Sequence, residues 1–384
     1  MKFIRVFFTV VATLLLTVII ALESSGNAHL LKGISNTYFV GHTGPTIDDY
    51  PIFESRLVET SEEIPLKFDD KYGALKVDQA LMGKIEEFDP AALLVLKDGA
   101  ILYEKYWDSY NNTSMTNSFS VAKSIVGLSI GKCLDLHLLK SLDQKVIDII
   151  PELKGTYRET ITLRHLMNMT SGINFDESYG NPFGFMAKAY YGESLLETTL
   201  EYTAETEPGT VWKYSGGNTI LLSVIVKRVT GQHLSDFVSA HFWKPLGASQ
   251  PALWNLDKKD GIEKAYCCFY SNAADFARFG QLILDSGMVD GKEVISRNFI
   301  NEIKKDQVLK DGSPVPKYGM HFWKTDYKSD IVYARGILGQ FIISIPDLNM
   351  VVVRLGHRRG DKDEFDHPSD VYLYIDLAYQ LVHQ

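Results

Sequence analysis

Ser120 and Lys123 are the residues of this sequence whose types and spacing most directly suggest covalent chemistry. They lie in the segment Asn117-Ser-Phe-Ser-Val-Ala-Lys-Ser124, which opens a stretch with a helical pattern. Residues three positions apart lie on one face of a helix, so the hydroxyl and the amine can meet within hydrogen-bond reach. Since a serine hydroxyl needs such a base to become a nucleophile, this SxxK pair predicts acyl transfer through Ser120.

The place of this pair at the start of a helix strengthens the prediction. Burial and the positive end of the helix dipole favour the neutral lysine amine, which is the form that accepts a proton. The residues after Lys123 are apolar nearly all round, with small residues interspersed, so we expect a central, buried helix. An SxxK pattern also arises by chance, with the serine as a helix cap and the lysine in solvent, so other residues must support it.

Segments in chain order over residues 86–384 resemble the serine β-lactamase, DD-peptidase and carboxylesterase superfamily. The branch they look most like contains the class C β-lactamase-related esterases and the 6-aminohexanoate-dimer hydrolases. The matching segments are 94–99, 118–123, 162–166, 169–172, 207–210, 214–218, 275–280, 318–319 and 336–340. An ordered series of matches is much less expected by chance than one short motif.

The resemblance implies that Tyr214 is a second base, which passes protons between nucleophile, lysine and leaving group. A buried tyrosine bonded to backbone is the alternative. The family motif is Tyr-x-Asn, whereas the first asparagine after Tyr214 in this chain is Asn218. We therefore assign Asn218, as an expectation, to orienting Lys123 or the substrate.

The family's Lys-Thr-Gly segment corresponds here to Ala334-Arg-Gly-Ile-Leu-Gly-Gln340. The resemblance implies an oxyanion hole made by the backbone N–H groups of Ser120 and Ile337, with Gly336 allowing close approach of the backbone to substrate. A bulge at the start of a strand is the alternative for the glycines. Loss of the motif lysine makes hydrolysis of β-lactams less expected, although Arg335 could supply a cation.

Metal and cofactor chemistry find no support in the sequence. The ten histidines do not fall at metal-ligand spacings, and neither a P-loop nor a GxGxxG motif is present, so we predict no metal and no cofactor. We expect a structural role for His165, because the family has no catalytic histidine at that place. Cys133, Cys267 and Cys268 make no disulfide framework, and neighbouring cysteines rarely bridge.

Residues 1–28 have the pattern of an export signal. Lys2 and Arg5 precede a largely apolar run from Val6 to Leu22, and a short polar stretch follows. The run is long enough either for a cleaved signal peptide or for a membrane anchor, and a buried core helix is a third reading. We expect an exported protein, periplasmic or membrane-anchored, with its catalytic domain outside the cytoplasm and membrane contact through this segment if it is uncleaved.

The composition fits a globular protein with a large core. The chain has 384 residues, 45% of them hydrophobic, which excludes disordered and fibrous classes. The formal charge of −9 leaves no basic surface for a phosphate backbone, so nucleic acid is excluded as a partner.

Two hairpin patterns lie near the two ends of the chain, at 91–96 with 100–106 and at 340–345 with 350–355. Between them the pattern is mainly helical, with helices expected at 120–134, 163–169, 219–230, 234–242 and 272–286, and a last helix at about 370–383. These patterns predict an α+β fold with an antiparallel sheet formed from both chain ends and flanked by helices. The expected domains are an N-terminal arm at 29–85 and a β-lactamase-like domain at 86–384, with a mainly helical insertion at about 130–265.

The residues together predict a serine hydrolase that cleaves an ester or amide bond of a small-molecule substrate. The catalytic residues would be Ser120, Lys123 and Tyr214. The changed motifs leave open a non-hydrolytic, penicillin-binding-like sensor or binding protein of the cell envelope. The physiological substrate, the cleavage of the N-terminal segment and the oligomeric state do not follow from the sequence.

Overall fold

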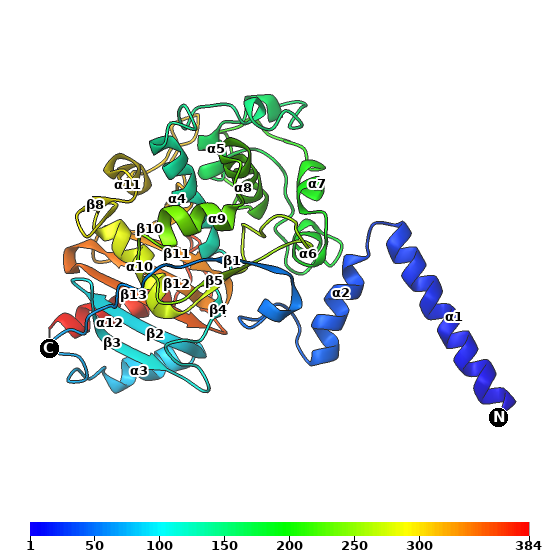
Figure 1. Cartoon of the computed structure of the whole chain (residues 1–384), viewed down its shortest axis with the longest axis horizontal. Coiled ribbons are helices and arrows are strands. Elements are labelled where there is room, and N and C mark those ends of the chain that lie inside the picture. The colour runs from blue at the N-terminus through cyan, green and yellow to red at the C-terminus, as the bar shows by residue number, and fades with distance from the viewer. Residues whose placement is uncertain (384) are drawn as a thin grey trace.

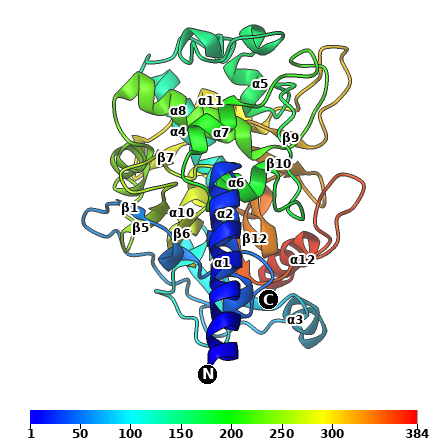
Figure 2. The same ribbon diagram turned by 90° about the vertical axis from the view of Figure 1, so that its right-hand side faces the viewer.

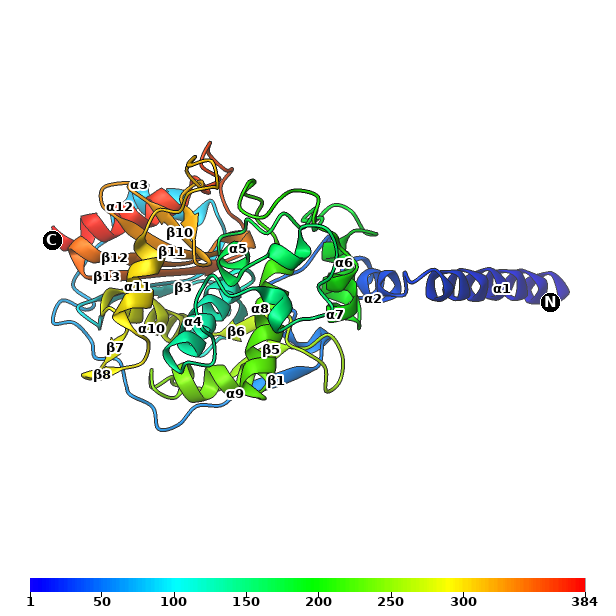
Figure 3. The same cartoon turned by 90° about the horizontal axis from the view of Figure 1, so that it is seen from above.

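The computed structural model describes residues 1–383. Helix α1 (Lys2–Ser24) projects away from the body of the molecule, as Figures 1 and 3 show, and it contains no buried residue. The reading of this segment as a buried core helix is therefore wrong. By length and composition α1 could cross a membrane, although a signal sequence passes the same test.

A seven-stranded antiparallel sheet forms the centre of the molecule, and it is built from both chain ends as predicted. In spatial order its strands are β3 (Ala100–Tyr106), β2 (Pro90–Lys97), β13 (Met350–Gly356), β12 (Gln340–Ile345), β11 (Ile331–Gly336), β10 (Phe322–Thr325) and β9 (Tyr318–Gly319). The N-terminal and C-terminal hairpins thus share one sheet through the pairing of β2 with β13.

The turns of these two hairpins are hydrogen-bonded to each other. Asp98 and Gly99 both adopt positive φ, at 51° and 77°, which is the backbone that a two-residue type I′ turn requires. The side chain of Asn349, in the other turn, donates a hydrogen bond of 2.7 Å to Oδ1 of Asp98, and the Asp98 N–H donates to the Asn349 carbonyl at 3.0 Å. The turn residues therefore help to fix the register between the two chain ends.

Helices cover both faces of the large sheet, as Figure 1 shows. α12 (Val371–Val382) and α3 (Gln79–Glu86) lie on one face, while α10 (Ala273–Leu284) and α4 (Val121–Asp135) lie on the other. Successive side chains of β13 alternate between the two apolar cores: Val351 and Val353 pack in one, and Val352 in the other.

A helical lobe stands on the α4 side of the sheet (Figure 1). Its helices are α5 (Leu163–Met167), α6 (Phe185–Tyr191), α7 (Leu195–Leu200), α8 (Gly216–Thr230), α9 (Leu234–Val238), the π-helix η5 (Ser239–Trp243) that continues α9, and α11 (Arg297–Lys304). The predicted helix at 163–169 is two residues too long, because Met169 adopts a positive φ of 59° that a helix does not allow.

Short 3-10 helices occupy several connections. They are η1 (Tyr38–Val40), η2 (Tyr50–Ile52), η3 (Val146–Asp148), η4 (Arg158–Thr160), η6 (Ile337–Gly339) and η7 (Pro346–Leu348).

The N-terminal arm takes part in the folded body. Strand β1 (Ser55–Val58) lies at the edge of a second sheet of order β1, β5 (Ala252–Asn255), β6 (Phe269–Ser271) and β4 (Thr116–Asn117). A small hairpin, β7 (Met288–Val289) with β8 (Lys292–Glu293), lies apart from both sheets. α2 (His29–Asn36) packs on α6, and Figure 1 shows it between α1 and the helical lobe, while Figure 2 looks along this direction with α1 and α2 in front of α6. These pairings are non-local, and strands of two to four residues carry too little pattern for the sequence to predict them.

α4 is buried along most of its length, as the sequence predicts. Glycines let neighbouring groups approach its axis closely. A Cβ at Gly131 would lie 2.4 Å from Cδ1 of Phe299, and one at Gly127 would lie 2.9 Å from the Met320 carbonyl oxygen. A larger residue at either position would therefore push α4 away from its neighbours, and with it the SxxK pair.

His321, in the turn between β9 and β10, joins three helices: α4, α5 and α8. Its Nδ1 lies 3.0 Å from the Met167 carbonyl oxygen, and its Nε2 lies 3.0 Å from Oγ1 of Thr219. A carbonyl can only accept, so Nδ1 carries the proton and Nε2 accepts from the threonine. The His321 carbonyl in turn accepts from Oγ of Ser124 at 2.6 Å. Burial lowers the pKa of His321 from 6.5 to about 3.

This buried imidazole should make the fold sensitive to acid. Between pH 6.5 and about 3 the unfolded chain binds a proton at His321 that the folded chain does not, so stability falls as the pH falls. At about pH 4.5 we expect a loss of about 2–3 kcal/mol from this group. The variant His321→Gln should show a smaller loss of unfolding free energy between neutral pH and about pH 4.5, measured by denaturant titration. The exposed His42→Gln is the control, and equal losses in all three proteins would contradict the account.

Candidate active site

Ser120 and Lys123 meet at the start of α4. Ser120 is the residue before the first helical residue, Val121, and Nζ of Lys123 lies 2.8 Å from Oγ of Ser120. Both side chains are buried, with the residues 8% and 1% exposed, so Lys123 is not the solvated lysine of a chance SxxK pattern. The structure thus places the pair at hydrogen-bond distance, as the helical spacing predicts.

The turn before Ser120 is held by Asn117. Its Oδ1 accepts hydrogen bonds from the N–H of Phe119 at 2.9 Å and of Cys268 at 3.1 Å, and its Nδ2 lies 3.0 Å from the Tyr270 hydroxyl. Phe119 adopts a positive φ of 45°, which is rare for an aromatic residue. Asn117 therefore stabilises a turn that sets the direction in which Ser120 enters α4.

Lys123 has a second partner that the sequence did not reveal. Its Nζ lies 2.9 Å from the carbonyl oxygen of Tyr266, and 5.6 Å from the centre of that ring. The two residues after Tyr266 are joined by the disulfide Cys267–Cys268, with an S–S distance of 2.10 Å. The expectation that neighbouring cysteines do not bridge is therefore wrong for this pair. Cys268 has a positive φ of 64°, which turns the chain at the bond.

Tyr214 lies beside the pair. Nζ of Lys123 is 5.0 Å from the centre of the Tyr214 ring. The ring packs edge-on against Tyr318 at 5.7 Å and tilted against Trp323 at 5.5 Å between ring centres. Two aromatic neighbours thus fix the ring, and Ser120, Lys123 and Tyr214 are gathered in one place.

Asn218, on α8, is directed to other partners. Its Oδ1 accepts a hydrogen bond of 2.7 Å from Oγ of Ser171, and its Nδ2 lies 3.3 Å from Sδ of Met169. The residue is 1% exposed. Within residues 1–383 no hydrogen bond joins Asn218 to Lys123, so its assigned role toward lysine or substrate stays a prediction.

Gly336, the last residue of β11, lies against the loop that carries Ser120. A Cβ at this position would lie 2.2 Å from the Ser118 carbonyl oxygen, so only glycine fits. From the sequence we expected Gly336 to let the backbone approach a substrate. In the structure it lets the end of β11 approach the Ser118 carbonyl. Ile337 follows as the first residue of η6, and N–H groups at the start of a helix have no acceptor within it.

Two buried side chains hold the η6 segment. Nε2 of Gln340 donates to the Ile337 carbonyl at 3.1 Å and to the Gly356 carbonyl at 2.7 Å. Nη1 of Arg354 donates to the carbonyls of Leu338 at 2.8 Å and Gly339 at 2.7 Å. This role of Arg354 could not be predicted from the sequence, because an arginine within an apolar strand shows its purpose only when η6 lies beside it.

Arg335 does not take the place of the motif lysine. Its Nη2 forms an ion pair of 2.9 Å with Asp366, and its guanidinium carbon lies 3.5 Å from the centre of the Trp323 ring. The residue is 8% exposed. Its charge is thus balanced within the protein rather than offered to a substrate carboxylate.

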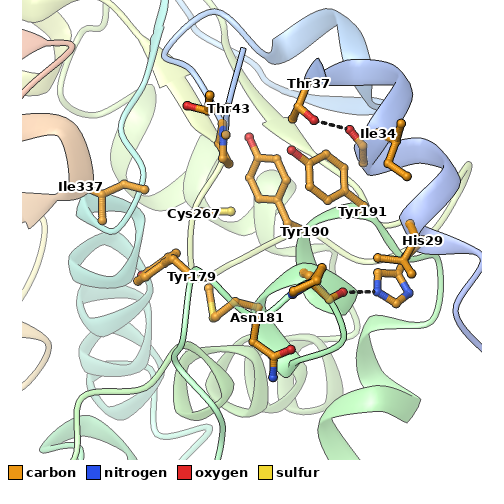
Figure 4. A pocket seen from close by; sticks show the side chains of 18 of the residues that line it. His29, Ile34, Thr37, Thr43, Tyr179, Asn181, Tyr190, Tyr191, Cys267 and Ile337 are labelled. Atoms are coloured by element: carbon orange, nitrogen blue, oxygen red, sulfur yellow. Dashed lines mark hydrogen bonds between the residues drawn. The ribbon is translucent and has the colours of Figure 1, made fainter. Parts of the chain in front are cut away.

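A pocket of about 400 Å³ opens beside Ser120. Near the SxxK pair it is lined by Phe119, Ser120, Tyr266, Cys267 and Ile337. Farther out, the wall comes from two helices, α2 and α6, as Figure 4 shows. Ser120 and Ile337, the two residues assigned to the oxyanion hole, therefore both border the same cavity.

Glu177 is a charged neighbour of the site that the sequence did not single out. Its Oε2 accepts from the N–H of Gly216, the first residue of α8, at 2.8 Å, and its Oε1 accepts from the Tyr179 hydroxyl at 3.3 Å. Burial raises the pKa of the Glu177 carboxyl, while the charge of Lys123 opposes that shift. The carboxylate and the lysine therefore act on each other electrostatically.

His165 is structural, as expected. Its Nδ1 accepts from the N–H of Thr162 at 3.1 Å, and the Thr162 hydroxyl accepts from the His165 N–H, which makes a capping box at the start of α5. Burial lowers the pKa of His165 from its usual value.

An antiparallel sheet built from both chain ends and flanked by helices is the fold that the β-lactamase and transpeptidase-like neighbours share with this chain. Residues 80–374 match the family model described as Beta-lactamase. The chain belongs to this family, and the predicted fold class and resemblance are confirmed.

Relatives within the class support a hydrolase. The chain is 26% identical over 291 residues to the 6-aminohexanoate-dimer hydrolase of Paenarthrobacter ureafaciens, covering 71% of this chain and 74% of that protein. A structure described as "Putative 6-aminohexanoate-dimer hydrolase from Bacillus anthracis" has a TM-score of 0.74 and 22% identity, covering 86% and 92% of the two chains. A family VIII carboxylesterase has a TM-score of 0.63 and 16% identity, covering 84% and 100%. The chain is thus a hydrolase of the β-lactamase-related type.

Glu177 gives a testable consequence for the pH dependence of activity. A nearby carboxylate stabilises the protonated form of a base at the site, so Glu177→Gln should remove that effect while keeping an oxygen for the Gly216 N–H. We expect the ascending limb of the pH profile of kcat/KM to move to lower pH by up to about one unit. Glu152→Gln, which alters a surface ion pair with Arg228, is the control. A limb that stays in place, or moves to higher pH, would show that Glu177 does not act on the base.

Proposed function

We propose that this protein is a serine hydrolase that cleaves an ester or amide bond through an acyl-enzyme on Ser120. The observation that carries the proposal is the 2.8 Å contact between Nζ of Lys123 and Oγ of Ser120, buried at the start of α4 and bordering a pocket. Tyr214 beside Lys123 supplies a second group that can hold or pass a proton.

The first step follows from the partners of Lys123. In its neutral form the amine donates one N–H to the Tyr266 carbonyl and keeps its lone pair for the Ser120 hydroxyl proton. Oγ of Ser120 then bonds to the substrate carbonyl carbon while the π electrons move to the carbonyl oxygen. That oxyanion is stabilised by the backbone N–H groups of Ser120 and Ile337.

The leaving group then departs. Protonated Lys123, directly or by a relay through the Tyr214 hydroxyl, gives its proton to the leaving oxygen or nitrogen as the bond of that atom to the carbonyl carbon breaks, which leaves the acyl group on Ser120. A water molecule, deprotonated by the same base, attacks the acyl carbon. The Ser120–acyl bond breaks, the carboxylic acid leaves, and the serine recovers its proton.

The substrate class follows from the relatives and from the charges around the site. One similar protein is named for an amide substrate, the 6-aminohexanoate dimer, and a structural neighbour is named a carboxylesterase. The Arg335–Asp366 ion pair removes the cation that would replace the motif lysine. We therefore propose that small-molecule esters or amides are preferred over penicillins, whose carboxylate would need such a partner.

We also propose that the catalytic domain acts outside the cytoplasm. α1 is fully outside the core and is apolar enough for either a signal sequence or an anchor. Nothing in the packing of the domain depends on it, because none of its residues is buried.

The proposal predicts which side chains turnover requires. Ser120→Ala and Lys123→Met should each lower kcat/KM for p-nitrophenyl acetate by at least about 1,000-fold, because each removes a member of the nucleophile and base pair. Tyr214→Phe should lower it by about 100-fold or more. Ser141→Ala, an exposed serine remote from the pocket, is the matched control and should keep wild-type turnover. The measurement is initial-rate release of p-nitrophenol.

Two outcomes would contradict the hydrolase. Full turnover in Ser120→Ala would exclude Ser120 as the nucleophile. A single stoichiometric burst from the wild-type protein, without later turnover, would instead indicate an acylated sensor of the cell envelope.

A further inference from the structure

The pocket beside Ser120 continues away from the catalytic groups into an apolar space between α2 and α6. Its outer lining includes Leu30, Ile34, Met186, Ala187 and Tyr191. Figure 4 shows the aromatic rings of Tyr190 and Tyr191 between Thr43 and the α2 side of the cavity. The whole pocket, from Ser120 to α2, has about 400 Å³, the size of a binding site for a small molecule.

Several polar groups of this wall are engaged within the protein, whereas the buried hydroxyls of Tyr191 and Tyr266 have no hydrogen-bond partner among the described residues. Nε2 of His29 lies 2.9 Å from the Pro182 carbonyl oxygen, and the Thr37 hydroxyl donates to the Gly33 carbonyl at 2.7 Å. The Tyr190 hydroxyl donates to Asp49 at 2.7 Å. The wall therefore offers a ligand mainly hydrocarbon and ring surface, whose burial is favourable for an aliphatic group.

The position of Tyr214 indicates which half of a substrate enters this space. In the proposed mechanism the proton reaches the leaving group from Lys123, directly or through Tyr214, so the leaving group lies on the side of these two residues, neither of which lines the pocket. Tyr214 packs on Tyr318 and Trp323, and it is not among the residues that line the pocket. The group in the pocket is therefore the acyl side of the scissile bond.

The mouth of the pocket suits an amphiphile. Tyr38 lines the pocket and is 67% exposed, and the next residues, Phe39 and Val40, are 80% and 59% exposed. These three side chains follow α2 after one residue, Thr37, and the other end of α2 is joined to α1, as Figure 1 shows. An aliphatic chain leaving a lipid surface or a micelle would meet this apolar rim first.

We propose that the space between α2 and α6 binds the aliphatic acyl chain of an amphiphilic ester or amide, with the scissile carbonyl at Ser120. This assignment rests on the proposed function and adds to it the class of acyl group. It gives residues 29–40 a purpose in selecting substrate: they form one wall of the acyl site and its entrance.

The test compares chain lengths on the two sides of the ester. The full chain, reconstituted in phosphatidylcholine vesicles, is assayed with p-nitrophenyl acetate, hexanoate and decanoate, and with decyl acetate. Each buried methylene favours binding by up to about fourfold, so we expect kcat/KM for the decanoate to exceed that for the acetate by about 100-fold or more. Decyl acetate, which carries its chain on the alcohol side, should show no comparable increase in kcat/KM over ethyl acetate, the short ester with the same kind of leaving group.

Two variants and a matched control link this preference to the pocket. Ile34→Asp places a charge in the lining and should lower the ratio of decanoate to acetate kcat/KM at least about 10-fold. Leu138→Asp, at a residue with the same 42% exposure that does not line the pocket, should leave the ratio as in the wild type. Ala187→Phe fills the space and should move the best substrate from decanoate to a shorter ester.

A binding measurement separates this inference from the catalytic proposal. The Ser120→Ala variant should bind the fluorescent fatty acid cis-parinaric acid, and the double variant with Ile34→Asp should bind it at least about 10-fold more weakly. An unchanged ratio in Ile34→Asp together with unchanged binding would overturn the acyl site. A gain for decyl acetate equal to that for the decanoate would overturn the acyl-side assignment. Chain binding without any Ser120-dependent turnover would contradict the proposed hydrolase instead.

Discussion

The site depends on one buried amine. Lys123 lies between Oγ of Ser120 at 2.8 Å and the Tyr266 carbonyl at 2.9 Å, with aromatic rings around it. In water a lysine is solvated and charged, whereas in this position its partners are fixed and few. The carbonyl orients the amine through one N–H, and the remaining lone pair can face the serine. A change that moved the Tyr266 carbonyl would release the amine, and one that moved α4 would carry base and nucleophile together away from that carbonyl.

Much of the fold around this amine serves to hold its neighbours in place. Asn117 fixes the turn into α4 through its side-chain oxygen. The end of β11 is pressed against the same turn at Gly336, and the Gln340 and Arg354 side chains fix the segment that follows. The candidate oxyanion donors therefore belong to two chain regions that approach each other at Gly336 and are each held by buried polar contacts. Such contacts are costly to break, so they favour a single geometry.

The sequence predicted the parts of this structure that are encoded locally. The two hairpins and the helix at α4 follow from turn residues and apolar periodicity, and SxxK spacing predicts the contact of Ser120 with Lys123. The groups of the site that lie far from Ser120 in the sequence could not be predicted in the same way. The Tyr266 carbonyl, the Glu177 carboxylate and the α2 wall reach the site only through tertiary packing. Every residue has a backbone oxygen, so residue types do not indicate which carbonyl will contact the lysine. The short strands of the second sheet have little periodicity from which they could be predicted.

The central claim is that an acyl group is carried by Ser120, and peptide-mapping mass spectrometry after an acid quench tests it most directly. The protein is mixed with an excess of p-nitrophenyl ester, quenched during turnover and digested. The account predicts an acyl mass on the peptide that contains Ser120, with fragment ions that place it on that serine, and no such mass in Ser120→Ala. Turnover with an acyl mass on another residue, or with the same adduct retained in Ser120→Ala, would contradict it.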